Sequence, residues 1–315
     1  MILGLVPFAL SQVYSSTLRE MGRTKVPMVS GIIAVLINLL LNYILIYGKF
    51  GAPALGVAGA ALATIIARVV ETFIIVLWTH RNKAEVPFII GAYKSLAIPR
   101  KLTKQIIIKG SPLMINEALW SGGMAIMTQC YSVRGLEVVG GINISSTISN
   151  LFNIVFIALG SSIAIIVGQL LGAGKMEEAK DTDRKLILFS VGCCVLLGAI
   201  MMVLAPIFPR IYNTTIEVRS LATSFIRIAA LCMPMYAFMH ATYFTLRSGG
   251  KTIVTFLFDS VFLWVVCIPL AFILTRFTAL DIVLIYLFCQ LIEIIKCIIG
   301  YILLKKGIWL NNIVA

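Results

Sequence analysis

The sequence contains few charged residues. Asp, Glu, Lys and Arg make up 12% of its 315 residues, whereas 60% are hydrophobic, and the mean hydropathy is +1.02. A soluble domain contains about 25% charged and about 45 to 50% apolar residues, so this composition excludes water as the main solvent. A helix that crosses a bilayer needs about 20 apolar residues, and many such runs follow one another here. We therefore expect an all-α, polytopic protein embedded in a lipid bilayer.

Motifs of several other functional classes are missing. No charged segment with a cleavable small-residue site precedes the first apolar run, so no secretory signal is expected. The seven cysteines lack the paired spacing of a zinc site or a disulfide framework. Gly-x-Ser-x-Gly and His-Glu-x-x-His are absent, which argues against an intramembrane enzyme. The net charge of +13 does not predict a nucleic-acid partner, because that needs a basic patch on a soluble surface.

Apolar runs between charged or Gly/Pro segments predict nine transmembrane helices. The run over 138–170 is longer than one bilayer crossing, so we expect it to tilt, to kink near Gly160 or to extend out of the membrane. The nine helices are expected near residues 3–18, 27–47, 56–79, 104–130, 138–170, 186–208, 219–246, 252–275 and 281–304.

Lys and Arg residues are distributed unevenly between alternate loops. Eighteen of the 26 fall in the loops of one side and five in those of the other, while Arg68, Arg227 and Lys296 fall within predicted helices. Cytoplasmic loops carry the excess of Lys and Arg. The side with eighteen, which includes the C-terminus, is therefore predicted to be cytoplasmic, and nine helices then place Met1 outside.

An internal repeat links two parts of the chain. Residues 17–27 read TLREMGRTKVP and residues 245–255 read TLRSGGKTIVT, with six identities in eleven positions. Each copy is expected to end one helix and begin the next. The second copy follows the fourth helix of a six-helix set, whereas the first follows only one. Two parallel six-helix halves would need three further helices before residue 1, which predicts a twelve-helix plan with both termini inside.

Three segments resemble the multidrug and toxic compound extrusion (MATE) family of transporters. They are ALSQVYSSTLREMGRTKVPM (9–28), INLLLNYILIYGKFGAPALGVAGAALATIIARVVE (37–71) and VGQLLGAGKMEEAK (167–180). The resemblance covers essentially the whole chain. It implies that the nine helices correspond to family helices 4 to 12 of a fold with two six-helix bundles. Residues 1–95 would then form the second half of the N-lobe with a cytoplasmic linker, and 96–315 the C-lobe.

Two amides and a hydroxyl are expected to meet at membrane depth. Asn38 and Asn42 are four residues apart, so both project from one helix face, where an unsatisfied polar group is costly. Thr64 lies one hairpin later and is expected to face them. In archaeal and bacterial MATE proteins, an Asn pair and a Thr of this kind resemble an N-lobe cation site completed by a first-helix Asp. The resemblance implies a Na⁺-responsive or H⁺-responsive site here; the alternative is interhelical hydrogen bonding, worth about 1 kcal/mol or less per pair.

Polar residues also form stripes on later helices. Glu117 matches an acidic position of the seventh family helix, and a charge at the bilayer centre costs at least about 2.5 kcal/mol, so it should be protonated, paired or exposed to water. Its role would be in ion coupling. Polar contacts between helices would explain a few such residues, but whole stripes favour a substrate cavity. The expected cavity residues on these two helices are Ser121, Met124, Thr128, Asn143, Ser146, Thr147, Asn150 and Asn153.

The helix over 219–246 lacks the acid found in some MATE branches, which argues against a second ion site there. It carries Tyr236 and His240 as further cavity candidates, and His240 has two interpretations, a proton relay or a packing histidine. Glu293 and Lys296, three residues apart, are interpreted as a structural ion pair.

The resemblance to the MATE family implies a monomeric antiporter of the cell membrane. It would export small organic, often cationic, compounds in exchange for H⁺ or Na⁺, without a further cofactor or metal. Two alternatives stay open. One is a lipid-linked oligosaccharide flippase, which needs several cavity Arg or Lys residues, whereas only Arg227 and Arg247 qualify. The other is an inactive fragment of a transporter.

Overall fold

The computed structural model describes residues 4–94 and 98–311, and these residues form helices and turns without a strand. The chain divides into two compact units, Met1–Pro99 (unit 1) and Arg100–Ala315 (unit 2). The all-α class expected from the composition is thereby confirmed. The assignment of the two regions to an N-lobe and a C-lobe stays a prediction.

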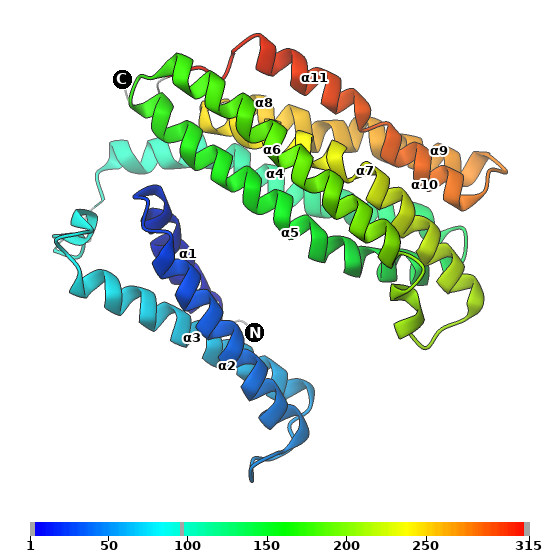
Figure 1. The fold of residues 1–315 in the computed structure, drawn as a ribbon, viewed down its shortest axis with the longest axis horizontal. Helices are drawn as coiled ribbons and strands as arrows, with labels where there is room; N and C mark the ends of the chain where they lie inside the picture. Colours follow the sequence, from blue (N-terminus) through cyan, green and yellow to red (C-terminus); the bar gives the residue numbers. More distant parts are fainter. Residues whose placement is uncertain (1–3, 95–97, 312–315) are drawn as a thin grey trace. The chain divides into compact units, whose positions relative to one another are not determined.

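The described residues of unit 1 include three long helices and the short 3₁₀ turn η2 (Figure 1). Its elements are α1 (Leu5–Glu20), α2 (Lys25–Tyr47), α3 (Val57–Arg81) and η2 (Pro87–Ile89). Helix α3 packs along both α1 and α2. A Cβ atom on Gly59 would lie 2.5 Å from the carbonyl oxygen of Leu45, so glycine is needed where α2 and α3 approach each other.

The two copies of the internal repeat form the same helix end. Gly22 and Gly250 have φ of +76° and +74°, which glycine adopts without steric cost. The next amide in each copy, of Arg23 or Lys251, donates to a carbonyl five residues earlier, with N···O distances of 2.8 and 3.1 Å. This is the Schellman motif. The expectation that each copy ends one helix and begins the next is confirmed.

Unit 2 contains the remaining long helices (Figure 1). Helix α7 is its centre, since α5, α6, α10 and α11 all pack against it. The elements are α4 (Arg100–Ser132), α5 (Leu136–Gly172), α6 (Met176–Leu204), η3 (Phe208–Ile211), α7 (Ile216–Ser248), α8 (Thr252–Phe256), η4 (Leu257–Val261), η5 (Leu263–Cys267), α9 (Ile268–Phe277), α10 (Ile282–Leu291) and α11 (Ile294–Lys305).

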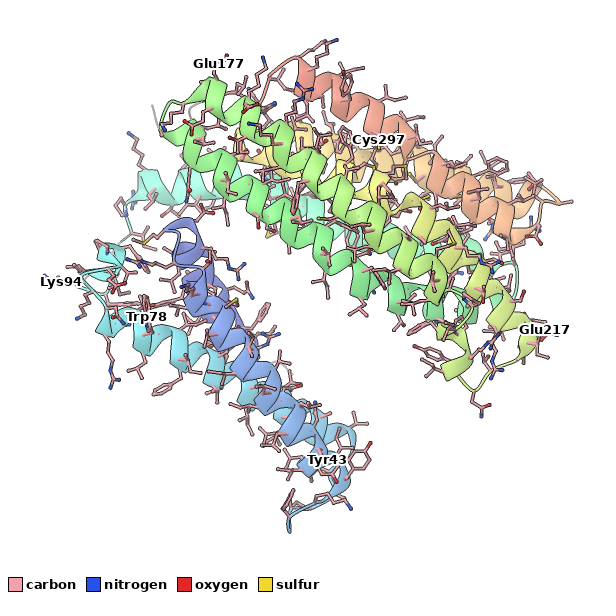
Figure 2. The ribbon with its side chains drawn as sticks, viewed as in Figure 1. Tyr43, Trp78, Lys94, Glu177, Glu217 and Cys297 are labelled. Atoms are coloured by element: carbon pink, nitrogen blue, oxygen red, sulfur yellow. The ribbon has the colours of Figure 1, made fainter. Side chains whose placement is uncertain are left out.

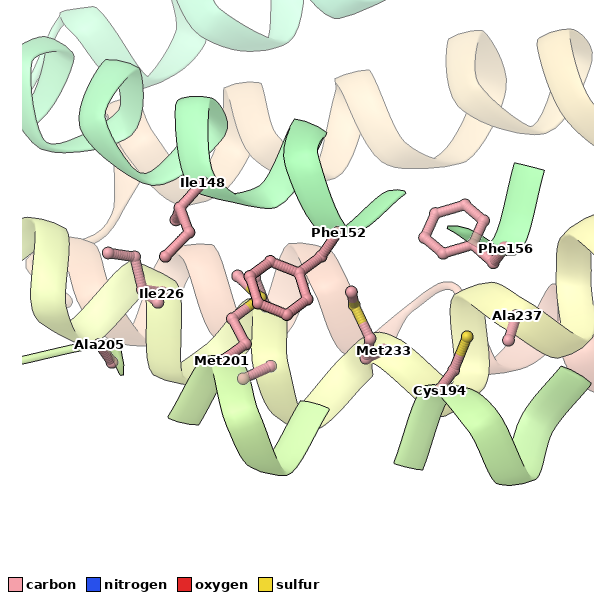
Figure 3. Packing of buried hydrophobic residues seen from close by; sticks show 11 residues of the cluster. Ile148, Phe152, Phe156, Cys194, Met201, Ala205, Ile226, Met233 and Ala237 are labelled. Carbon is pink, nitrogen blue, oxygen red and sulfur yellow. The ribbon is translucent and has the colours of Figure 1, made fainter. Parts of the chain in front are cut away.

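The main core of unit 2 lies between α5, α6 and α7. Figure 3 shows Phe152 and Phe156 of α5, Met201 of α6 and Met233 of α7 pointing into one apolar cluster. Small residues allow the close approach of these helices. A Cβ atom on Gly160 of α5 would lie 2.4 Å from the Phe244 ring of α7. Helix α5 continues through Gly160 without a break, so its 37 residues, about 55 Å of helix, require tilt or extension beyond the bilayer.

Two of the predicted spans are interrupted helices. Residues 252–277 run as one helical segment in which η4 and η5 are π-helical turns, and residues 282–305 are divided by a turn at Ile292 and Glu293. A π turn inside an α-helix shifts the following side chains around the helix axis, and such turns occur often at functional sites. Both interruptions lie next to the polar interior described below.

Within the described part of the chain, seven segments are long and apolar enough to cross a membrane: α2, α3, α5, α6, α7, Thr252–Phe277 and Ile282–Lys305. The other two predicted spans also form helices. Helix α1 has only 16 residues, and α4 is continuous but carries polar residues such as Asn116 and Glu117 within its apolar sequence. Apolar side chains project outward along the helices of each unit (Figure 2), and Leu39 of α2 is 67% exposed. Such a surface requires lipid or another apolar partner.

Candidate functional site

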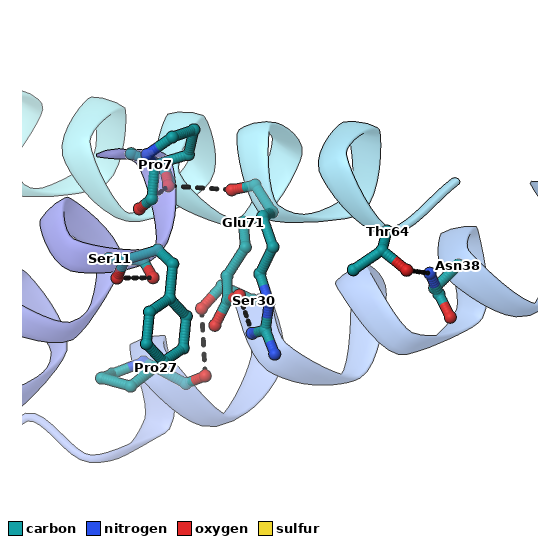
Figure 4. A network of polar contacts seen from close by, with 10 residues as sticks. Pro7, Ser11, Pro27, Ser30, Asn38, Thr64 and Glu71 are labelled. Atoms are coloured by element: carbon teal, nitrogen blue, oxygen red, sulfur yellow. Dashed lines mark hydrogen bonds and ion pairs between the residues drawn. The ribbon is translucent and has the colours of Figure 1, made fainter. Parts of the chain in front are cut away.

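Unit 1 brings Asn38, Asn42 and Thr64 together, as the spacing predicts. The Asn38 amide nitrogen lies 3.4 Å from the Thr64 hydroxyl oxygen across the hairpin (Figure 4), and the Asn42 amide donates to Asn38 Oδ1 at 3.0 Å. The Thr64 hydroxyl itself donates to the carbonyl of Ala60. The carbonyl oxygen of the Asn42 side chain is buried and accepts no hydrogen bond from the described residues. An acceptor of this kind is costly in an apolar interior, and its partner would be a cation or a hydrogen-bond donor.

An ion pair lies along the same face of α3, one and two turns beyond Thr64. Arg68 donates to Glu71 Oε2 at 2.8 Å, and its guanidinium lies 5.1 Å from the centre of the Phe8 ring. The Glu71 side chain is buried, and Figure 4 shows it close to Ser30 of α2. Both residues lie within the span predicted over 56–79, and the sequence pattern assigned no role to either. The i, i+3 spacing was the signal that could have paired them.

Unit 2 contains a cavity of about 550 Å³ between α4, α5, α7, the π turns and α10–α11. A volume of this size suits a small organic molecule. Apolar and aromatic side chains form most of its wall, with a few polar groups among them. Of the expected residues, it is lined by Glu117, Met124, Thr128, Ser146, Asn150, Asn153, Tyr236 and His240.

Three other expected cavity residues lie outside this lining. Ser121, Asn143 and Thr147 are exposed. The Thr147 and Ser146 hydroxyls both donate to the Asn143 carbonyl at 2.9 Å, so the backbone satisfies them. The contribution of these three residues to a substrate path stays a prediction. The positions of Asn143 and Thr147 show that only part of the α5 polar stripe lines the cavity.

Tyr236 and His240 are held by contacts across the cavity. The Tyr236 hydroxyl donates to Gln290 of α10. His240 Nδ1 lies 3.1 Å from the Tyr236 carbonyl oxygen, and its ring packs 4.5 Å from the Phe156 ring. These contacts fix the imidazole with one edge on the helix backbone. They fit a packing histidine that lines the cavity, and its role as a proton relay stays a prediction.

The cavity also contains a charge cluster that sequence reasoning did not assemble. Lys296 Nζ lies 2.8 Å from Glu293 Oε2, which confirms the expected pair, and 3.8 Å from Asp259 Oδ1 of η4. Asn116 of α4 donates to the other Asp259 oxygen at 3.1 Å. Asp259 lies within the span predicted over 252–275 and was not among the expected site residues. An ionisable residue inside a membrane segment is by default a functional candidate, and that signal was present in the sequence.

Glu117 and Arg247 complete the charged lining of the cavity. Both are exposed, at positions on α4 and near the end of α7. Arg227, the other basic candidate, is exposed and lies outside the lining. The described residues contain no group of three or more His, Cys, Asp or Glu side chains that could hold a metal ion. The cavity therefore combines a partly apolar wall with a few charges of both signs.

Comparison with known proteins gives consistent matches. The family model described as MatE matches residues 1–44 and 112–273. The probable multidrug resistance protein NorM of Thermotoga maritima is 25% identical over 275 residues, covering 87% of this chain and 58% of the relative. The multidrug resistance protein MdtK of Edwardsiella ictaluri is 29% identical over 223 residues, covering 70% of this chain and 48% of the relative. The chain thus spans about half to three fifths of these relatives.

Solved structures share the fold. A multidrug resistance MATE family transporter of the MOP superfamily, in an outward-facing conformation, superposes with a TM-score of 0.87 at 18% identity, covering 97% of this chain and 67% of the other. A mutant of the Vibrio cholerae MATE transporter VcmN gives a TM-score of 0.84 at 20% identity, covering 98% and 68%. At this identity the likeness concerns the fold.

Proposed function

Because the chain belongs to the MatE family, we propose that it acts as a secondary transporter that exports small organic compounds across the cell membrane. Relatives named as multidrug resistance proteins support this substrate class. The observation that carries the proposal is the cavity of about 550 Å³ in unit 2, whose aromatic and Met-rich wall suits apolar molecules of varied shape. Its charged groups suit a substrate with a polar or cationic end.

The proposed mechanism is antiport. Solved structures of a MATE family transporter in outward-facing and inward-facing conformations support alternating access as its physical basis. A coupling ion drives export only if it binds one conformation better than the other. We assign this role to the Asn38, Asn42 and Thr64 cluster, where a buried amide oxygen lacks a donor, and to Glu117, which lines the cavity.

The coupling ion is H⁺ or Na⁺. Amide and hydroxyl oxygens are ligands for a hard cation, but without a carboxylate they bind it weakly. We further propose that the protein is a monomer and that its C-terminus is cytoplasmic. The excess of Lys and Arg on that side supports the orientation. The flippase alternative is weaker, because Lys296 is paired with two carboxylates and leaves Arg247 as the unpaired cation of the described lining.

Transport into inverted membrane vesicles tests the proposal. An imposed pH gradient or an imposed Na⁺ gradient drives uptake into vesicles that contain the protein, with a fluorescent organic cation as the substrate. We expect accumulation with one gradient and collapse of the signal when that gradient is dissipated. Equal dye accumulation in vesicles without the protein, or accumulation that ignores both gradients, would contradict an antiporter.

A further inference from the structure

Lys296 lies in an unusual place for a lysine. Its side chain is 9% exposed, and its ammonium lies between the carboxylates of Glu293 and Asp259, at 2.8 and 3.8 Å. The face of the Phe262 ring lies 5.2 Å below the same nitrogen. Two anionic groups and an aromatic face therefore surround one compact positive charge. This is the environment that a desolvated cation requires.

The two carboxylates are positioned by groups other than Lys296. Asp259 Oδ2 accepts the Asn116 amide at 3.1 Å, and Asn116 Oδ1 accepts the Ser260 hydroxyl at 2.7 Å. Glu293 Oε1 lies 3.5 Å from the Cys267 sulfur, which donates to it. In each carboxylate, one oxygen thus accepts a hydrogen bond from a neighbouring side chain and the other faces the Lys296 ammonium. Both carboxylates therefore have hydrogen-bond donors besides Lys296.

Interrupted backbone creates this arrangement. Asp259 belongs to the π turn η4, between buried Phe258 and Ser260, and Glu293 lies at the turn that separates α10 from α11. In an uninterrupted α-helix, three consecutive side chains point about 100° apart and cannot all face inward. The two irregularities bring carboxylates from different helices to one point. Irregular helices at membrane depth line ion sites in other secondary transporters.

We propose that Asp259 and Glu293 form a monovalent-cation site in unit 2, and that the Lys296 ammonium is its built-in occupant. The cluster carries two negative charges and one positive charge, so the ammonium occupies the position and provides the charge of a bound alkali cation. A divalent ion is a poor substitute, because Ca²⁺ takes six to eight oxygen ligands and two of the four carboxylate oxygens here already accept hydrogen bonds. Removal of the ammonium should leave a site that takes Na⁺ or K⁺ from solution.

Cation-dependent stability tests this inference without any transport measurement, so its failure is separate from failure of the transport proposal. The protein is purified in detergent with Asn42→Ala, which removes the unpaired amide oxygen of unit 1. Unfolding temperatures are compared in NaCl, KCl and choline chloride at one ionic strength, and again after adding CaCl₂. Lys296→Met removes the ammonium and keeps the chain length, while Lys296→Arg keeps the positive charge as a matched control.

We expect Lys296→Met to unfold on the order of 5 °C higher in NaCl or KCl than in choline chloride, as binding to the folded state requires. The parent and Lys296→Arg should show no such difference. Adding Asp259→Asn to Lys296→Met should abolish the gain, and binding of radioactive ²²Na⁺ should follow the same order.

Several results would overturn the proposal. One is an unfolding temperature of Lys296→Met that is the same in NaCl, KCl and choline chloride. Another is a rise in unfolding temperature that persists after Asp259→Asn is added. A third is a rise with CaCl₂ but not with NaCl or KCl. If Lys296→Met accumulates poorly, Lys296→Gln repeats the measurement, and recovery of either variant by Na⁺ or K⁺ during purification supports the proposal. Failure of both variants in both salts counts against it, because a free cation should then replace the ammonium.

Discussion

Unit 1 and unit 2 satisfy buried polar groups in different ways. In unit 1, Asn38, Asn42 and Thr64 form a neutral cluster, and one amide oxygen is left without a donor. In unit 2, Asp259 and Glu293 are ionisable, and each has an oxygen facing the ammonium of Lys296. The cluster in unit 1 therefore has one acceptor without a hydrogen-bond donor, whereas in unit 2 the Lys296 ammonium balances the two carboxylates. The amide oxygen without a donor supports the proposed role of the unit 1 cluster in binding an ion from solution, beside that of Glu117 in unit 2.

The largest effect on stability is expected when a carboxylate is removed from unit 2. Asp259→Ala leaves the Asn116 amide without its acceptor and Lys296 with one carboxylate. Because loss of one partner leaves a buried charge under-compensated, we expect unfolding to become easier by about 3 to 5 kcal/mol. Thermal denaturation in detergent measures the change. A matched Asp281→Ala variant, which removes an exposed cap of α10, should cost about 1 kcal/mol, and equal losses would contradict the distinction.

The next largest effect is expected for a charge added to the unit 1 cluster. Asn42→Asp places a carboxylate where the unpaired oxygen lies, with nearly the same shape. We expect about tenfold tighter Na⁺ binding, about 1.4 kcal/mol, because a charged ligand attracts a hard cation more strongly than an amide. Titration of thermal stability with NaCl measures it, with Asn82→Asp at the end of α3 as a control for added charge. Unchanged Na⁺ affinity in Asn42→Asp would remove this cluster from the coupling mechanism.

The third prediction concerns the hydrogen bond across the unit 1 hairpin. Thr64→Val keeps the volume and removes the hydroxyl, so the Asn38 amide loses one acceptor. Interhelical hydrogen bonds in membranes contribute about 0.6 kcal/mol on average, and we expect a destabilisation of that order in the same denaturation assay. Weaker dependence on the coupling ion should accompany it. A loss of several kcal/mol would instead identify Thr64 as a structural residue.

The smallest effect on stability is expected for Glu117→Gln. Glu117 is exposed at the cavity and has the shape of Gln, so membrane abundance and unfolding temperature should stay the same. Ion-driven export should be lost, because the titratable charge is gone. Western blotting of membranes alongside vesicle transport separates the two readouts. Parallel loss of abundance and transport would assign Glu117 to folding.

Sequence patterns predicted much of this architecture because hydrophobic runs and helix ends are local signals. The spacing of Asn38, Asn42 and Thr64 was sufficient to predict their contact, since one hairpin connects them. The Asp259–Lys296 contact joins two helices through irregular backbone, and no periodicity indicates where a π turn will occur. The same limit applies to α5, where the polar stripe could not show that Asn143 and Thr147 lie outside the lining of the cavity.

The close fit around Gly249 explains a difference between the two repeat copies. A Cβ atom there would lie 2.1 Å from the carbonyl oxygen of Trp309, because the segment after α11 passes over the end of α7. The equivalent position in the first copy is Met21, whose side chain is 40% exposed. The two copies therefore differ at a position where their surroundings differ, because only Gly249 is covered by another segment. A residue exchange between copies is therefore asymmetric: Met21 accepts glycine easily, while Gly249 accepts methionine only if the chain around Trp309 moves.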